Sequence, residues 1–344
     1  MPLDSDAAND FMTALRRMRL LQPDERPTLV ALQGGVSSDI VRADLRTGPV
    51  CIKRALHKLK VKADWQAPVE RNRWEVEWMR VVAGIEPDAV PRILGADESL
   101  GMFAMAFLSP QTYPLWKARL RDGTIEPPFA AEVGARLARI HAATANNAQL
   151  RSRFATDHIF LPIRLEPYLI ATGRVHPDLS FRLDALARRT LATHLALIHG
   201  DISPKNILCG PRGPVFLDAE CAWYGDPAFD LSFCLNHMLL KCTWRPQWSN
   251  RYLGCFDALA GAYLESVDWE PVQMLERRSA ELLPALFLAR VDGKSPVEYI
   301  NEDWQREAVR RVARRLLASP VDRLELVAAA WRAETEQWPP RTES

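Results

Sequence analysis

A stretch of short apolar strands and polar loops in the second half of the chain narrows its possible folds more than any other segment. Asp201 and Asn206 lie on the loop that enters the first strand, and Asp218 and Glu220 follow the second. Between the strands, residues 210–214 read Gly-Pro-Arg-Gly-Pro, which favours a tight turn and therefore a hairpin. Such a hairpin would gather carboxylates and a carboxamide around one small volume.

This combination of side chains predicts a particular chemistry. Two carboxylates and an amide oxygen are hard ligands suited to Mg²⁺, which commonly also binds substrate phosphates. A remaining carboxylate near such a metal can orient a hydroxyl group and accept its proton. The segment therefore indicates metal-assisted phosphoryl transfer. An ordinary acidic hairpin, with surface Asp and Glu residues fortuitously spaced, is the alternative.

The same residues resemble a known superfamily. His-Gly-Asp at 199–201, then Asn206 and Asp-Ala-Glu at 218–220, is similar to the catalytic core of the aminoglycoside phosphotransferase and choline kinase-like small-molecule kinases. The Asp-x-Glu pair, followed by Trp-Tyr-Gly-Asp at 223–226, is closest to the methylthioribose kinase branch. The resemblance implies a two-lobed α+β protein-kinase-like fold. We expect an antiparallel sheet with a helix in residues 1–108, and a mainly helical lobe in residues 109–344.

The resemblance also implies roles for the catalytic segment. Asp201 would orient the substrate hydroxyl and accept its proton. Asn206 and Asp218 would bind Mg²⁺ at the nucleotide phosphates, and Glu220 would add a metal or water contact. Lys205 is a possible phosphate contact outside the main assignment. Asp230 would brace the loop.

A glycine-containing turn early in the chain is a candidate for the nucleotide phosphates. It joins an extended segment at 28–32 to another at 40–45. Backbone N–H groups in such a turn can approach phosphate, although Gly-Gly between strands is usually just a hairpin. The candidate contacts are Gly34, Gly35, Ser37 and Ser38.

A lysine and a glutamate would complete the nucleotide site. Lys53 ends an apolar strand and is similar to the kinase lysine that holds the α- and β-phosphates of ATP. On a helix over 70–83, Glu75 borders the inward face, which makes it the predicted partner of Lys53. By the same resemblance, adenine would bind backbone groups between Ala106 and Leu108, before the connection to the second lobe.

The C-terminal part is predicted to wall the acceptor pocket with helices. Between two of them, the segment 288–296 reads as a loop that carries Arg290, Asp292 and Lys294. Arg290 is the candidate contact to the substrate or to the transferred phosphoryl group, and a solvated helix end is the alternative. His141 lies on an apolar helical face, which favours a packed, hydrogen-bonded role.

The spacing after Asp218 bears on the acceptor. A helix is predicted to follow almost at once, at 229–240, which leaves no room for the peptide platform of protein kinases. A small acceptor with a hydroxyl group is therefore expected, with a sugar or sugar-like alcohol favoured. Aminoglycosides and amino alcohols such as choline remain alternatives. A non-catalytic nucleotide-binding module is an alternative of another class.

Composition limits the other possibilities. The formal net charge of +1 over 344 residues gives no support for nucleic-acid or membrane attraction. The six cysteines show no zinc spacing, which favours reduced thiols in a cytoplasmic protein. The expected partners are ATP, Mg²⁺ and a small hydroxyl substrate, and the oligomeric state is left open.

Overall fold

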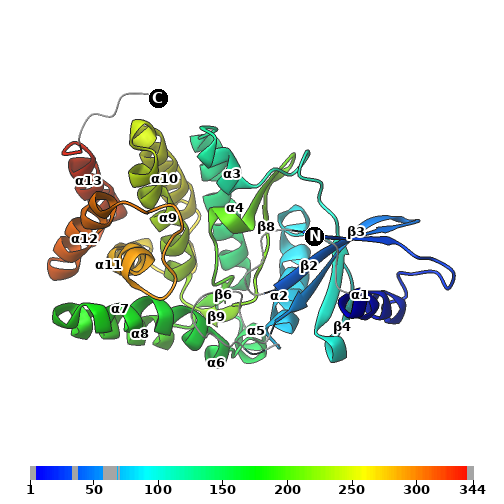
Figure 1. Ribbon diagram of the computed structural model, residues 1–344. Helices are drawn as coiled ribbons and strands as arrows, with labels where there is room; N and C mark the ends of the chain where they lie inside the picture. The colour runs from blue at the N-terminus through cyan, green and yellow to red at the C-terminus, as the bar shows by residue number, and fades with distance from the viewer. Residues whose placement is uncertain (1–4, 33–37, 57–67, 69, 339–344) are drawn as a thin grey trace.

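The computed structural model describes residues 5–32, 38–56, 68 and 70–338. Figure 1 shows a twisted sheet with α1 and α2 at one side of the molecule and helices α7–α13 at the other. The elements of the sheet side are α1 (Ser5–Arg17), β1 (Thr28–Ala31), β2 (Ser38–Leu45), β3 (Gly48–Ala55), α2 (Arg71–Ile85), β4 (Ile93–Asp97) and β5 (Met102–Ala106). The two-lobed α+β fold is confirmed, whereas the boundary between residues 108 and 109 stays a prediction.

The five strands form an antiparallel sheet in the order β1-β2-β3-β5-β4. Because successive side chains of a strand point to opposite faces, alternate residues of β3 serve different cores. Ile52 packs with Phe11 of α1 on one face, whereas Cys51 belongs to the larger core that includes Val76 of α2. Lys53 shares the face of Cys51, so its side chain points toward α2.

Helices and small β-ladders precede and follow the catalytic loop at residues 199–206. These elements are α3 (Trp116–Arg121), α4 (Pro127–Thr144), α5 (Ala148–Arg153), α6 (Asp157–Phe160), the π-helical segment η3 (Leu161–Ile170), α7 (Ala171–Val175), α8 (Ser180–Ala192), β6 (Ala196–Ile198), β7 (Ile207–Gly210), β8 (Gly213–Phe216) and β9 (Trp223–Gly225). As predicted, β7 and β8 pair as a hairpin, and β6 pairs with β9.

The last helices are α9 (Pro227–Trp244), α10 (Ser249–Leu264), α11 (Val272–Asp292), α12 (Asp303–Ala318) and α13 (Leu324–Thr335). Helix α9 is buried on all sides, because it packs against α10 and α11 and its first turn lies beneath the catalytic loop. It begins nine residues after Asp218, so the predicted lack of a long segment at this point is correct.

Three further findings concern the first helix, the cysteines and membrane spans. The first helix spans Ser5–Arg17, and Arg19 just beyond it adopts a positive φ of 59° that ends the helical path. All six cysteines are buried and free. Among the described residues, no helix is both long enough and apolar enough to cross a membrane.

Candidate functional site

A buried ion-pair network joins the two lobes. The Nζ atom of Lys53 lies 2.6 Å from Oε2 of Glu75 and also contacts Oδ1 of Asp218. Lys53 and Glu75 are almost fully buried, whereas the Asp218 side chain is 26% exposed. Burial disfavours the charged lysine, but Asp218 and Glu75 outweigh it and raise the pKa of Lys53. The predicted partnership of Lys53 and Glu75 is thus present, and Asp218 joins it.

The Asp218 carboxylate stays ionised in this network. Burial alone would raise its pKa, but the adjacent Lys53 ammonium holds the pKa of Asp218 well below its usual range. The backbone of Asp218 has a φ of 69°, an uncommon conformation for a residue with a side chain, and such conformations cluster at functional sites. One carboxylate oxygen binds Lys53, which leaves the other for a further ligand.

The second cluster lies at the catalytic loop, around Asp201. This carboxylate is 2% exposed, and its Oδ2 atom accepts a hydrogen bond from Nδ2 of Asn206 at 2.9 Å. The same oxygen lies 2.9 Å from Nη2 of Arg164 and 3.1 Å from Nζ of Lys205. Burial would raise the pKa of Asp201, but these two cations lower it below the ordinary value. Asp201 is therefore an ionised acceptor.

Two residues that contact Asp201 were not part of the predicted site. Arg164 comes from η3, where its Nε atom also donates to the carbonyl of Gly200 at 2.5 Å. No local sequence signal marked Arg164, because its partner is 37 residues away in the chain. Lys205 did carry a signal, since it stands four residues after Asp201, but we predicted only a possible phosphate contact.

The loop around Asp201 is held by backbone hydrogen bonds. The N–H groups of His199 and Gly200 donate to the two carboxylate oxygens of Asp230, at 2.7 and 2.8 Å. His199 donates from Nε2 to the carbonyl of Leu217 at 2.9 Å and accepts from the Asp201 N–H at Nδ1. Burial lowers the pKa of His199, so it is a neutral brace with a fixed tautomer. The predicted bracing role of Asp230 is confirmed.

Gly200 has a specific structural requirement. Its φ is +79°, and a Cβ atom at this position would lie 2.6 Å from the carbonyl oxygen of Cys221. We expect Gly200→Ala to lower the free energy of unfolding by about 2–4 kcal/mol, as the sum of left-handed strain and overpacking. Urea unfolding measures this loss. The matched control is Gly84→Ala in α2, where the added methyl group meets no atom within 4 Å. There we expect a gain of about 0.5–1 kcal/mol, and equal effects of the two substitutions would contradict the assignment.

The predicted metal ligands differ in how they are held. Nδ2 of Asn206 is engaged with Asp201, which orients its Oδ1 atom away from that residue, and Asp218 has a second carboxylate oxygen. These hard oxygens fit Mg²⁺. Glu220 instead lies 2.9 Å from Nε of the buried Arg71 of α2, a partner that the sequence did not reveal. Within the described part of the chain, no group of three His, Cys, Asp or Glu side chains is arranged to hold a metal ion.

The structure describes only some of the residues that were predicted to contact the nucleotide from the sheet. Gly34, Gly35 and Ser37 lie outside the described residues. Ser38 is the first residue of β2, buried and opposite Ala55 of β3. At the expected adenine contact, the N–H of Ala106 donates to the carbonyl of Arg92, and Leu108 lies beyond the end of the strand. Adenine recognition by these backbone groups stays a prediction.

The segment 288–296 was predicted to be a loop, but its first half, which carries Arg290, is helical. Helix α11 continues to Asp292, so Arg290 lies in its last turn and is buried. Its Nη1 atom donates to the hydroxyl of Tyr168 at 3.0 Å and to Oγ of Ser295 at 2.9 Å. Asp292 pairs with Arg310, so it belongs to the α11–α12 contact, and Lys294 pairs with Glu166 at the surface.

Two other titratable residues have structural roles. Nδ1 of His141 lies 2.8 Å from the hydroxyl of Tyr263, and its Nε2 lies 3.4 Å from Asp230. This buried arrangement agrees with the packed role predicted for it. Asp226 caps the first turn of α9 and forms a close ion pair with Arg278.

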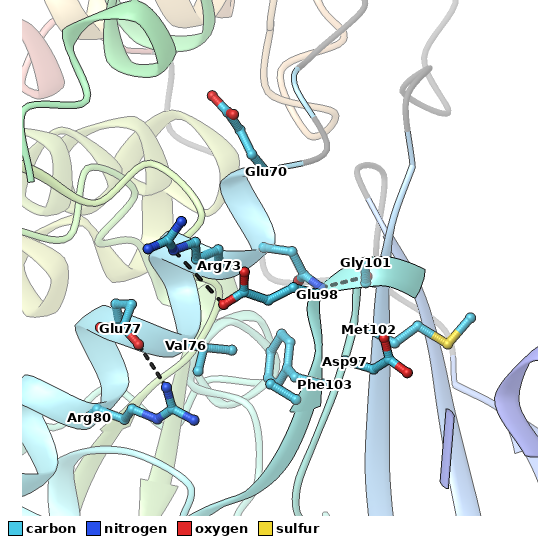
Figure 2. A pocket seen from close by; sticks show the side chains of 12 residues that line it. Glu70, Arg73, Val76, Glu77, Arg80, Asp97, Glu98, Gly101, Met102 and Phe103 are labelled. Atoms are coloured by element: carbon cyan, nitrogen blue, oxygen red, sulfur yellow. Dashed lines mark hydrogen bonds and ion pairs between the residues drawn. The ribbon is translucent and has the colours of Figure 1, made fainter. Parts of the chain in front are cut away.

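A hollow of about 260 Å³ lies between α2 and the strands β4 and β5 (Figure 2), and Asp201 is not among its lining residues. Across it, Arg73 of α2 reaches Glu98, while Glu77 and Arg80 pair along the helix. Its lining comes from the face of α2 that does not carry Glu75. This hollow mixes both charge signs and does not contain the residues assigned to chemistry.

Comparison with known proteins agrees with the geometry. Residues 28–264 match the phosphotransferase enzyme family, and this span includes Lys53, Glu75, Asp201 and Asp218. The chain belongs to the phosphotransferase enzyme family. The predicted resemblance is therefore confirmed at the level of the family.

Relatives of this phosphotransferase include methylthioribose kinase 1 of Oryza sativa subsp. japonica, which is 24% identical over 225 residues, or 56% of this chain and 51% of the relative. A methylthioribose kinase of Geobacillus thermodenitrificans is 25% identical over 230 residues, covering 59% of this chain and 58% of the relative. The phosphotransferase thus spans little more than half the length of these relatives. An amicoumacin kinase solved with AMP-PNP and Ca²⁺ is similar in fold, with a TM-score of 0.52, 13% identity and coverage of 97% and 96% of the two chains.

Proposed function

We propose that this protein transfers the γ-phosphoryl group of Mg²⁺-ATP to a hydroxyl group of a small, sugar-like molecule. The observation that carries the proposal is the presence of two networks joined by the backbone, where the N–H of Leu217, next to Asp218, donates to the carbonyl of Asn206 at 2.9 Å. Lys53, Glu75 and Asp218 form one of them, and the ionised Asp201 with Asn206 forms the other. A nucleotide-binding module without catalysis would need the first network but not the second. The complete set therefore supports an enzyme.

Each residue has a chemical task in this proposal. Asp201 holds the acceptor hydroxyl and takes its proton while the new bond between oxygen and phosphorus forms and the bond to the ADP leaving group breaks. Lys53, fixed by Glu75, contacts the nucleotide phosphates. Asn206 and Asp218 are the residues that would hold Mg²⁺, with Glu220 behind them. Mg²⁺, when bound, neutralises charge on the phosphate oxygens. Arg164 and Lys205 keep Asp201 ionised and fix its direction.

Several observations support a small sugar-like acceptor. Helix α9 begins nine residues after Asp218, where a peptide platform would otherwise have to stand. The relatives named above are methylthioribose kinases, which supports a sugar-like alcohol without defining the substrate.

The free cysteines support a reducing, cytoplasmic setting.

Amino alcohols of the choline type are less well supported. They would require an open aromatic cage. Trp223 is fully buried and stacks on Phe160, and Trp304 packs against Trp338. The faces of Trp244 are approached by Lys241 and Arg245 of this chain itself. These three tryptophans are thus engaged by other side chains of the protein.

The test is consumption of Mg²⁺-ATP across a panel of sugars, sugar derivatives, amino alcohols and aminoglycosides. Turnover with an acceptor, with the phosphorylated product identified by mass spectrometry and ³¹P NMR, is the expected result. Loss of that turnover in Asp201→Asn links it to this site. Failure of the protein to bind Mg²⁺-ATP at all would contradict the proposed function.

A further inference from the structure

A row of side chains on α9 leads away from the catalytic loop. Phe233, His237 and Lys241 follow one another at intervals of four residues, so they lie on one face of the helix. The ring of Phe233 lies 5.8 Å from the Arg164 guanidinium, which itself binds Asp201, and 5.9 Å from the ring of His237. This face of α9 therefore begins beside Asp201 and continues to Lys241.

Lys241 is a buried cation without an acidic partner. Its side chain is almost fully buried, and within the described chain no carboxylate pairs with its Nζ atom. Nζ lies 4.9 Å from the ring centre of Trp244 and 4.7 Å from that of Tyr299. Burial and the nearby Lys117 lower the pKa of Lys241 to about 7, although Glu298, which pairs with Lys117, partly opposes this shift. Aromatic faces offset part of the cost of burying a charge, but they do not replace a counter-ion.

Arg290 reaches the same region from α11. It is buried, and its Nη1 atom donates to uncharged groups: the Tyr168 hydroxyl and the carbonyl and hydroxyl of Ser295. Its Nε atom is buried without a hydrogen-bond partner. Nε2 of His237 and the hydroxyl of Tyr299 are also buried without a hydrogen-bond partner. Buried polar atoms in native proteins are nearly always paired with protein, water or ligand, so these three atoms leave the region with hydrogen-bonding capacity for a polar ligand.

The charge balance of the region indicates the sign of that ligand. Burial lowers the pKa of His237 well below its ordinary value, and the cations of Arg290, Lys241, Lys205 and Lys117 lower it further. In the part of the chain that the structure describes, two carboxylates are paired with cations of this group. Asp201 serves Arg164 and Lys205, and Glu298 serves Lys117. Arg290 and Lys241 remain without acidic partners among the described residues.

We propose that the acceptor substrate carries an anionic group, a carboxylate or a phosphate ester, which is bound by Lys241, Arg290 and His237. This inference rests on the proposed function, because it concerns the acceptor of the same site. It narrows the substrate from sugar-like alcohols in general to sugar acids or sugar phosphates. It also disfavours aminoglycosides, whose positive charges would be repelled.

The fold sets the separation between the two ends of such an acceptor. Asp230, in the first turn of α9, binds the backbone of the catalytic loop, and His237 follows it by seven residues. At about 1.5 Å per residue this places the anion on the order of 10 Å from the loop. The acceptor would therefore carry its hydroxyl and its anion at opposite ends.

The experiment compares matched acceptors that differ in charge. The pairs are D-gluconate with D-glucitol, and D-ribose 5-phosphate with D-ribose, with inorganic phosphate and acetate as the smallest anions. Calorimetric binding to the nucleotide-free protein and turnover with Mg²⁺-ATP are both measured. We expect at least one anion to bind about 10- to 100-fold more tightly than its neutral counterpart, as charged hydrogen bonds allow. Preference for a carboxylate or for a phosphate then identifies the class.

Three variants show whether the preference arises at Lys241. Lys241→Met keeps an unbranched, apolar side chain between the two rings and should reduce the anion preference at least ten-fold. Lys241→Arg should retain most of it. Arg332 of α13 forms an exposed ion pair with Asp257 of α10. Arg332→Met removes the positive charge of that pair and should leave the anion preference unchanged. A preference that survives in Lys241→Met would overturn the assignment.

The outcomes separate this inference from the proposed function. Turnover of neutral acceptors with no preference for anions supports the kinase activity and overturns the anion site. Anion binding that requires Lys241, without turnover of any acceptor, supports the anion site and contradicts the kinase activity. If none of the anions binds the native protein, the anion site is wrong.

A pH-dependent stability measurement provides a further check on Lys241. Because its pKa is about 7 in the folded protein and near 10.4 in an unfolded chain, the unfolded state binds more protons between these values. The charged form of Lys241 therefore lowers the free energy of unfolding by its full amount below pH 7, and this loss decreases as the pH rises toward 10. We expect Lys241→Met to have a higher Tm than the native protein at pH 7, with the gap narrowing as the pH rises. A lower Tm at pH 7 would indicate a structural lysine instead.

Discussion

Asp201→Asn is expected to lower kcat by about 10²–10⁴-fold, the contribution typical of a positioned general base. Asparagine has nearly the same shape but cannot accept the proton, so the acceptor and the nucleotide should still bind. Because Arg164 and Lys205 lose their shared counter-ion, the variant should also be somewhat less stable. Steady-state kinetics with Mg²⁺-ATP and calorimetric nucleotide binding measure the two effects separately.

The control for this prediction is Arg332→Met, whose pair with Asp257 lies on the surface and far along the chain from the site. It should leave kcat unchanged. If Asp201→Asn retained more than a tenth of the native kcat while binding nucleotide normally, another group would have to accept the proton.

Lys53→Met should be the second most damaging substitution, for activity and for stability. Losing one preorganised cation at a developing phosphate charge typically costs about 10²–10³-fold in rate. The substitution also leaves the buried Glu75 without its counter-ion, and breaking a buried pair costs about 3–5 kcal/mol. Kinetics and urea unfolding provide the two readouts.

The double variant Lys53→Met/Glu75→Gln distinguishes the two effects. Removing the unpaired carboxylate should restore part of the stability but none of the activity. Recovery of activity together with stability would show that Lys53 only supports the fold, and that its proposed contact with phosphate is wrong.

The anion proposal and the catalytic assignment depend on the same helix. Asp230 at the start of α9 fixes the backbone that carries Asp201, and His237 and Lys241 stand further along that helix. A rigid, buried helix can therefore set both the position of the reacting hydroxyl and the distance to the charged end of the acceptor.

Local patterns were sufficient for much of the fold. The apolar positions Val76, Met79 and Val82 follow a helical period, and all three are buried in α2. That period also placed Glu75 toward the sheet, where it meets Lys53. The turn residues between β7 and β8 defined their hairpin. In each case, the residues that decide the structure are neighbours in sequence.

Local patterns failed where a distant partner decides the structure. The segment after residue 288 is polar and was expected to be a loop, yet α11 continues to Asp292, whose carboxylate is paired with Arg310 of α12. Local patterns also did not reveal the partner of Glu220, because Arg71 is 149 residues away in the chain. The metal or water contact expected of Glu220 stays a prediction.

The sequence by itself determined the chemical type of this protein, because the catalytic loop, the hairpin and the acidic pair lie within some 20 consecutive residues. Their residue types and order indicated metal-assisted phosphoryl transfer, and their resemblance to small-molecule kinases implied the family. Beyond the Lys53–Glu75 pair, the tertiary structure decided which charges compensate one another. Arg164 comes to Asp201 from η3, and Arg290 comes from α11 toward the face of α9 that carries Lys241. Ion pairing depends on distance in space and on burial, and neither is encoded in the spacing of residues far apart in the chain.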